Sequence, residues 1–235
     1  MCWSIAASIT FTVLGFIYSS YVITYRKQYS TTDILTTIFY TIMEFTQMLQ
    51  YYYLGECSQM NFNLTIFIHF LLWIQPLLAN FYGFCETSKN KNIFSFAMVL
   101  SFVALIVSFV QLLVGETCDD CYLADNMLNV GNQTCTTMGK VHLQWQFRSA
   151  NLRGFNANWL LFGMLVILPN WYHSESILSR PLNWILPLIA AIIFVGELNN
   201  EVYAVWCAYT IPYGTLLIFR ELNKYIGTKN VKDAK

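Results

Sequence analysis

One carboxylic acid lies where an apolar sequence should have none. Glu44 falls in the middle of the apolar run 32–54, and amides follow it at Gln47 and, in the next run, at Gln75 and Asn80. A charge at the centre of a lipid bilayer costs at least about 2.5–3.5 kcal/mol, so such an acid must be paired or protonated. Two interpretations of Glu44 remain open. It belongs to a site for an ion, a proton or a ligand, or it makes a structural hydrogen bond that fixes its helix.

Further polar and aromatic residues recur at helical spacing on the same faces as these groups. Tyr51 aligns with Glu44, a second stripe carries His69 and Trp73, and Trp206 lies in the last apolar run. A histidine such as His69, taken alone, is more often a packing histidine with satisfied hydrogen bonds than a member of a site. The candidate site for an ion or ligand comprises Glu44, Gln47, Tyr51, His69, Trp73, Gln75, Asn80 and Trp206.

No set of residues predicts catalysis or a metal site. The three histidines, His69, His142 and His173, fall at different expected depths, so they do not form a three-histidine zinc site. Phosphate-binding loops and nucleophile elbows are absent from the sequence. An intramembrane enzyme is therefore the third choice, after transport and binding, and no cofactor is predicted.

The elements that must position these residues are membrane helices. The chain is 56% hydrophobic and only 11% charged, against about a quarter charged in ordinary soluble domains. A spanning helix needs roughly 20 apolar residues. Seven such runs occur, at about 4–25, 32–54, 63–84, 93–115, 154–172, 181–198 and 202–220. We expect an all-α, seven-helix transmembrane domain over 1–222, an outer loop at 116–153 and a cytoplasmic tail at 223–235.

The basic residues orient these runs. Of the 13 Lys and Arg residues, three (Lys140, Arg148 and Arg153) fall on the side of the long loop, and the others fall on the opposite side. Basic residues collect on the cytoplasmic side of membrane proteins. The sequence therefore predicts an outer N-terminus and an inner C-terminus, in a plasma membrane, a secretory membrane or a viral envelope. The lipid bilayer is the expected partner, nucleic acid is not, and homo-oligomerisation is left open.

Cysteines and glycosylation sequons agree with this orientation. The sequons at Asn63 and Asn132 fall on the outer side, although Asn63 lies close to the expected bilayer. Thiols that face an oxidising space pair with one another more often than they bind metal. At least one disulfide in the outer loop is expected, without a defined pairing, among Cys2, Cys57, Cys118, Cys121 and Cys135.

The outer loop contains one strand-like segment. Val141, Leu143, Trp145 and Phe147 alternate with polar residues, and a period of two is typical of a strand. The segment predicts either a short β-hairpin lying as a lid over the helices or an interfacial segment with aromatic anchors.

A set of residues spread along the chain forms a recognisable pattern: Met1-Cys2-Trp3-Ser4, Met43-Glu44 with Gln47 and Tyr51, Cys57, Asn61, Gln75-Pro76 with Asn80, and Trp206-Cys207. In this pattern the chain resembles an uncharacterised seven-span family of algae, protists and large DNA viruses. The resemblance covers nearly the whole chain and implies no activity. Trp73, Pro76, Trp184 and Pro187 carry a weaker resemblance of the chain to microbial rhodopsins. No lysine lies within any run, so a retinal Schiff base is excluded.

Proline favours an open interior. Pro76, Pro187 and Pro212 fall inside apolar runs, where proline frees a carbonyl and tends to kink the helix. We expect a central pocket that opens outward and passes an ion, a proton or a small solute, with Glu44 as its titratable group. The alternative is a receptor-like protein that binds a lipid or a hydrophobic small molecule.

Overall fold

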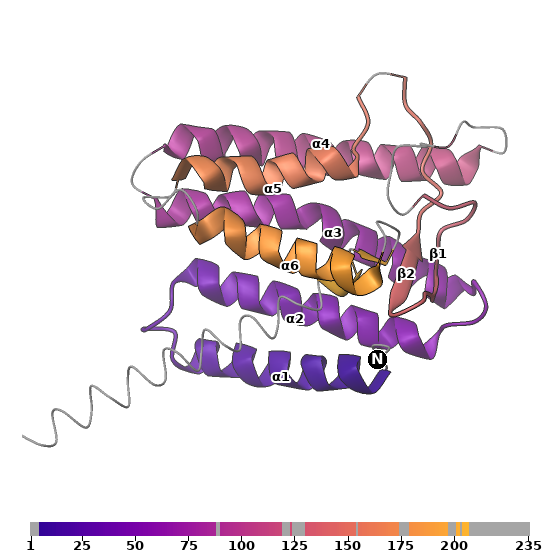
Figure 1. Cartoon of the computed structure of the whole chain (residues 1–235), viewed down its shortest axis with the longest axis horizontal. Helices are drawn as coiled ribbons and strands as arrows, with labels where there is room; N and C mark the ends of the chain where they lie inside the picture. Colours follow the sequence, from indigo (N-terminus) through magenta and orange to yellow (C-terminus); the bar gives the residue numbers. More distant parts are fainter. Residues whose placement is uncertain are drawn as a thin grey trace, which may run out of the picture.

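In the part of the chain that the structure describes, six long helices run alternately in opposite directions along the long axis of the molecule (Figure 1). The computed structural model describes residues 5–87, 90–118, 123, 130–153, 155–173, 179–196, 201–202 and 204–206. Within them lie α1 (Ile5–Thr24), α2 (Thr31–Tyr52), α3 (Gln59–Glu86), α4 (Lys91–Thr117), α5 (Trp159–His173) and α6 (Ser179–Val195). The expected helical architecture is therefore present over the first six runs, and the seventh lies almost entirely outside the described residues.

Three of these helices could cross a membrane. Among the described residues, α1, α3 and α4 are long and apolar enough to do so, and α5 contains a shorter apolar stretch. Large apolar side chains point away from the protein on several helices, with Ile17 62%, Phe96 65% and Ile193 74% exposed. Soluble monomers rarely expose contiguous apolar surface on this scale. The chain is thus suited to membrane association, while seven spans remain a prediction.

Small residues bring α1 against α2. The buried residues of α1 are Ser8, Thr12, Gly15, Ser19 and Val22. A Cβ atom on Gly15 would lie 2.9 Å from the Thr41 hydroxyl, and the hydroxyls of Ser19 and Thr41 are 2.9 Å apart. Small and hydroxyl residues allow close helix packing within membranes. The polar stripe of α1 is thus a packing face.

Local sequence explains where α2 begins and why α5 begins late. Ser30 and Asp33 form a reciprocal capping box at the start of α2, which satisfies two backbone N–H groups. The Gln111 side chain of α4 accepts from the N–H of Ala157 and donates to the carbonyl of Ala150. The preceding loop is thereby tied to α4, and α5 starts five residues later than expected.

Proline occurs in three described helices. Pro76 lies in α3 and Pro187 in α6, as expected, and Pro169 lies in α5, where the sequence analysis did not consider one. Pro212 is outside the described residues.

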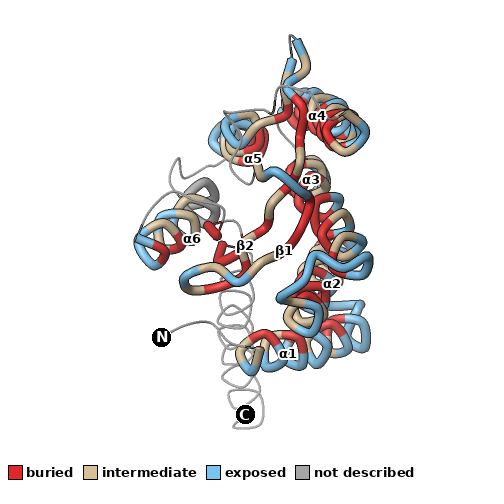
Figure 2. The backbone as a smooth tube through the Cα atoms, turned by 90° about the vertical axis from the view of Figure 1, so that its right-hand side faces the viewer, coloured by how far each residue is buried: buried red, intermediate tan, exposed pale blue. Residues whose placement is uncertain are grey.

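The outer loop contains a small antiparallel sheet. Strands β1 (Cys135–Met138) and β2 (Leu143–Gln146) pair with Thr136 opposite Trp145. Leu143 and Trp145 are 0% exposed, so the hairpin prediction is confirmed, and the interfacial interpretation is wrong. The hairpin is also more than a lid. In Figure 2 it lies between α6 and the pair α2 and α3, with much of its backbone coloured as buried.

Candidate functional site

Glu44 is buried in the second half of α2. Its side chain is 1% exposed, and Oε1 accepts a long hydrogen bond of 3.5 Å from Gln47 Nε2, one turn further along the helix. The second carboxylate oxygen, Oε2, has no hydrogen-bond partner among the described residues. A buried polar atom without a partner is rare in a folded protein and calls for an explanation. Glu44 is therefore the first candidate for a group that does chemistry.

Gln47 connects this acid to the hairpin. Gln47 Oε1 lies 2.8 Å from Nε2 of His142, which is 0% exposed, and His142 Nδ1 lies 2.7 Å from the hydroxyl of Tyr51. Because the Gln47 oxygen can only accept, Nε2 carries the hydrogen, and Nδ1 accepts from Tyr51. Burial lowers the pKa of His142 to about 3, so the ring is neutral at ordinary pH.

A second layer of hydrogen bonds fixes the hairpin to α2 and α3. Gln50 donates to the Thr136 hydroxyl at 2.7 Å and accepts from the indole of Trp145 at 3.1 Å. Asn61 accepts from the N–H of Thr136 at 2.8 Å and donates to its carbonyl at 2.8 Å. Thr65 lies 2.7 Å from the hydroxyl of Thr136. The end of α2 near Gln50 and the start of α3 near Asn61 are thus covered by the hairpin, which fills the place where an opening of the central pocket was expected.

Glu201 captures the turn of the hairpin. Its carboxylate accepts from three consecutive backbone N–H groups, those of Lys140, Val141 at 2.9 Å and His142 at 3.3 Å. Successive N–H groups in a turn form a small anion-binding concavity. The Glu201 side chain is only 2% exposed, and the three backbone donors take the place of water around its carboxylate.

The other predicted polar residues lie in the interior but do not reach Glu44. Gln75 Nε2 contacts the sulfur of Met43 at 3.0 Å. Asn80 donates to the carbonyls of Pro76 and Leu165, which joins α3 to α5. His69 is 1% exposed and packs edge-on against Phe109 and Phe147. Both ring nitrogens of His69 are buried without a hydrogen-bond partner among the described residues, so a role in the site and a role in packing both stay open as predictions.

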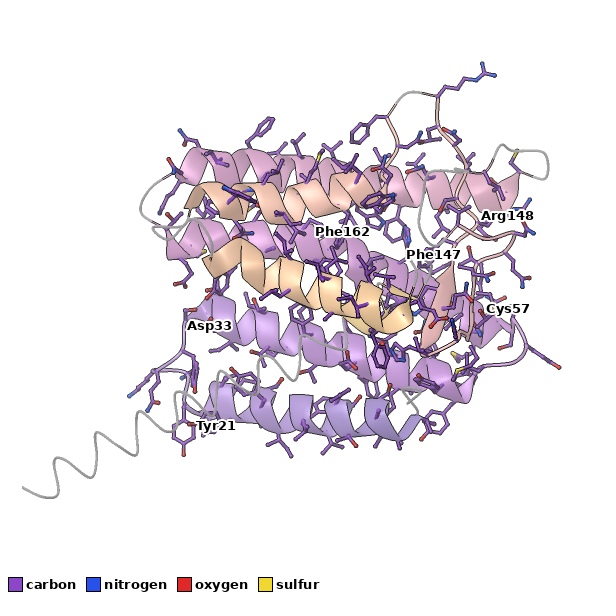
Figure 3. The ribbon with its side chains drawn as sticks, in the orientation of Figure 1. Tyr21, Asp33, Cys57, Phe147, Arg148 and Phe162 are labelled. Carbon is purple, nitrogen blue, oxygen red and sulfur yellow. A yellow bond between two sulfur atoms is a disulfide. The ribbon has the colours of Figure 1, made fainter. Side chains whose placement is uncertain are left out.

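The two predicted tryptophans meet through a third ring. Phe162 of α5 packs edge-on against Trp73 at 5.8 Å and against Trp206 at 5.6 Å between centroids. All three side chains are at most 4% exposed. Figure 3 labels Phe162 on α5. In the described residues these aromatic rings are in contact with one another, as in a packed core.

A disulfide joins the hairpin to the connection between α2 and α3. Cys57 pairs with Cys135 across 78 residues of sequence, and Figure 3 labels Cys57 beside this bond. Cys118 is disulfide-bonded as well, and Cys85 is a free thiol. The expected disulfide of the loop 116–153 is confirmed, while Cys2 and Cys121 lie outside the described residues. Among the residues that the structure describes, no three His, Cys, Asp or Glu side chains lie close enough together to hold a metal ion.

The two glycosylation sequons lie in different parts of the fold. Asn132 is exposed in the outer loop, whereas Asn63 is exposed in the first turn of α3 beside the buried Thr65. Use of either sequon stays a prediction.

Sequence reasoning missed most of the hairpin contacts. Gln50, Asn61, Thr65, Thr136 and Glu201 were not candidates, and His142 was considered only for zinc. A signal was available, because polar residues at the outer ends of two apolar helices need partners. The identity of those partners required the pairing of segments 75 and 95 residues apart in the sequence.

Comparison with known proteins places the chain in a group without an assigned role. Residues 6–228 match the model of a family of unknown function, DUF5765. An uncharacterized protein of Acanthamoeba polyphaga mimivirus is 28% identical over 230 residues, which cover 93% of this chain and 94% of the viral protein. No solved structure matches the chain.

Proposed function

Because this chain belongs to the DUF5765 family of unknown function, its role has to be inferred from its own residues. We propose that it is a multi-pass membrane protein that passes an ion, a proton or a small solute across the membrane. Glu44 is its titratable group. The membrane is a plasma membrane, a secretory membrane or a viral envelope, and the β1–β2 hairpin faces the outer side.

One observation carries the proposal. The Glu44 carboxylate is buried, receives one weak hydrogen bond and has an oxygen without a partner among the described residues. A structural carboxylate would be expected to fill its hydrogen-bonding capacity, as Glu201 does in the same protein with three N–H donors. Ionisable groups inside membrane helices are rare and commonly mark ion paths and proton relays.

The test is flux through the purified full chain in proteoliposomes, measured for protons with an internal pH dye and for Na⁺ and K⁺ with ion-sensitive dyes. Glu44→Gln removes the ionisable group and preserves the shape of the side chain. We expect this variant to lower the flux to that of protein-free vesicles.

Glu56→Gln is the matched control, because Glu56 is exposed in the connection between α2 and α3. This variant should keep the wild-type rate. Wild-type flux in a folded Glu44→Gln protein, or no flux of any kind in the wild type, would remove the basis for the proposal.

A further inference from the structure

Four side chains form one connected chain from the middle of α2 to its outer end. The order is Glu44, Gln47, His142 and Tyr51, with successive separations of 3.5, 2.8 and 2.7 Å. Three of them come from α2, and His142 enters from the turn of the hairpin 95 positions away from Gln47. Glu44, Gln47 and His142 are at most 1% exposed, whereas Tyr51 is half-buried. This row of hydrogen-bonded side chains thus leads from the buried Glu44 toward the outer surface.

The direction of the hydrogen bonds in this chain suits the movement of a proton. His142 presents Nε2–H toward the interior and accepts the Tyr51 hydroxyl hydrogen at Nδ1. This neutral form can release one proton on its inner side while it receives another on its outer side. With a pKa of about 3 caused by burial, the ring does not retain an added proton and can pass it on.

A hydrated metal ion fits this region poorly. Thr136, Trp145 and Gln50 are fully buried or nearly so and are hydrogen-bonded to one another. Calcium and magnesium need six or more oxygen ligands, and the described residues contain no cluster of metal ligands. A proton differs, because it advances by exchange of hydrogen bonds and does not have to displace the hairpin.

We propose that the species passed is the proton, and that His142 and Tyr51 carry it from the outer side to Glu44. This inference rests on the function proposed above. Gln47 separates donor and acceptor in the structure, and its 3.5 Å bond to Glu44 is weak enough to exchange. When the amide turns aside, the His142 Nε2–H bond breaks and an O–H bond forms on the ionised Glu44. Nδ1 takes the Tyr51 proton, and the Tyr51 oxygen takes one from a hydronium ion on the outer side, which becomes water. One proton has then moved inward, and the imidazole is left neutral with its hydrogen on Nδ1. A turn of the ring that brings this N–H back toward Gln47 restores the starting form before the next transfer.

The groups around His142 fit this role. Tyr51 and Gln47 of α2 contact its ring, and the Glu201 carboxylate accepts its backbone N–H. Glu201 thus holds the backbone of His142 in place, while the two ring nitrogens bond to Tyr51 and Gln47. His142 and Tyr51 act as proton carriers, and Glu201 is a positioning residue.

The experiment measures the initial rate of proton entry into proteoliposomes with an imposed membrane potential. The variants are His142→Gln, which makes hydrogen bonds but carries no exchangeable proton between two nitrogens, and Tyr51→Phe, which deletes one oxygen. Tyr52→Phe is the matched control, because the Tyr52 ring is 61% exposed one residue away. We expect at least about a tenfold loss for His142→Gln and Tyr51→Phe, since a positioned proton carrier contributes roughly 10²–10⁴-fold. Tyr52→Phe should keep the wild-type rate.

The outcomes separate the two proposals. If Glu44→Gln stops the flux while folded His142→Gln or Tyr51→Phe retains the wild-type rate, the route through His142 is wrong and the proposed function stands. If the wild type passes Na⁺ or K⁺ and no protons, the assignment of the proton is overturned. Thermal unfolding and an intact Cys57–Cys135 disulfide establish folding. If His142→Gln fails to fold, Tyr51→Phe decides the question.

Discussion

Single residues determine where the hairpin sits. The carboxylate of Glu201 gathers three backbone N–H groups of one turn, and Gly139 lies beside it without a side chain. A Cβ atom at position 139 would overlap the carboxylate of Glu201. Charge-assisted hydrogen bonds of this kind contribute more than neutral ones. The turn therefore depends on two residues that are 62 positions apart in sequence.

Gly139→Ala should destabilise the protein, because the added methyl group forces the turn away from Glu201. We expect a loss of about 1–3 kcal/mol, the usual consequence of leaving a buried polar group unsatisfied. The measurement is thermal unfolding in detergent, together with hydrogen exchange at the amides of Lys140 to His142.

The control is Gly163→Ala in α5, where a Cβ atom meets nothing within 4 Å. There we expect no loss or a small gain, because alanine favours helix over glycine by about 0.5–1 kcal/mol. Equal losses in the two variants would argue against the role of the Glu201 contact.

Acid should weaken the hairpin through His142. The folded pKa is about 3, whereas the unfolded ring has the ordinary pKa of 6.5. Neutral His142 therefore contributes its full stability above about pH 6.5, and this contribution is lost progressively as pH falls toward 3. Each pH unit within that window removes up to about 1.4 kcal/mol.

The pH effect can be measured as the unfolding midpoint between pH 7.5 and pH 4.5 for the wild type and His142→Gln. The variant should show a shallower decline, since it lacks the group that takes up a proton on unfolding. Parallel declines for the two proteins would show that His142 is not the responsible group.

At the scale of elements, the hairpin is joined to α2 and α3 covalently as well as by hydrogen bonds. The Cys57–Cys135 disulfide closes a loop of 78 residues that contains α3 and α4. Such a cross-link stabilises a protein by up to about 4 kcal/mol through the restricted unfolded chain. Helices that remain formed in the unfolded state within a membrane reduce this stabilisation by the disulfide.

Replacing Cys57 and Cys135 together by Ser should lower the unfolding temperature and increase proteolysis of the outer loop. Cys85→Ser is the control, because Cys85 is exposed and free, and it should change neither property. If the double variant unfolded at the wild-type temperature, the hydrogen bonds of Thr136 would suffice to hold the hairpin.

Most of the helices and the strand character of the hairpin could be predicted from the sequence, because the length and hydropathy of a segment are local properties. The positions of six helices and the strand character of the segment around Trp145 follow from such patterns. The burial of Glu44 followed in the same way. The contact between His142 and Gln47 could not be predicted, because it depends on how a loop folds back on distant helices. The contact of Glu201 with the hairpin turn could not be predicted for the same reason.

At the scale of the whole molecule, the proposed orientation places the hairpin outside and Cys85 inside. Cys85 lies near the end of α3 that is opposite to the hairpin. A membrane-impermeant maleimide added to intact cells should therefore fail to label Cys85 and should label it after permeabilisation. Cys85→Ser identifies the signal from this thiol.

A second marker of orientation is glycan at Asn132, which should disappear in Asn132→Gln when the chain is expressed through a secretory pathway. Labelling of Cys85 from outside, or a glycan-free chain, would reverse or remove this orientation.

The disulfide also has a consequence for the order of assembly. Cys57 and Cys135 stand on either side of α3 and α4, so their sulfur atoms can meet only after both helices have been delivered to their places during synthesis. Glu201 leaves the ribosome later still, after α5 and α6. The hairpin turn is therefore secured last, once nearly the whole chain has been made. Cells that lack an oxidising folding compartment should accumulate a precursor in which the described helices α1 to α6 are placed but the hairpin is not secured.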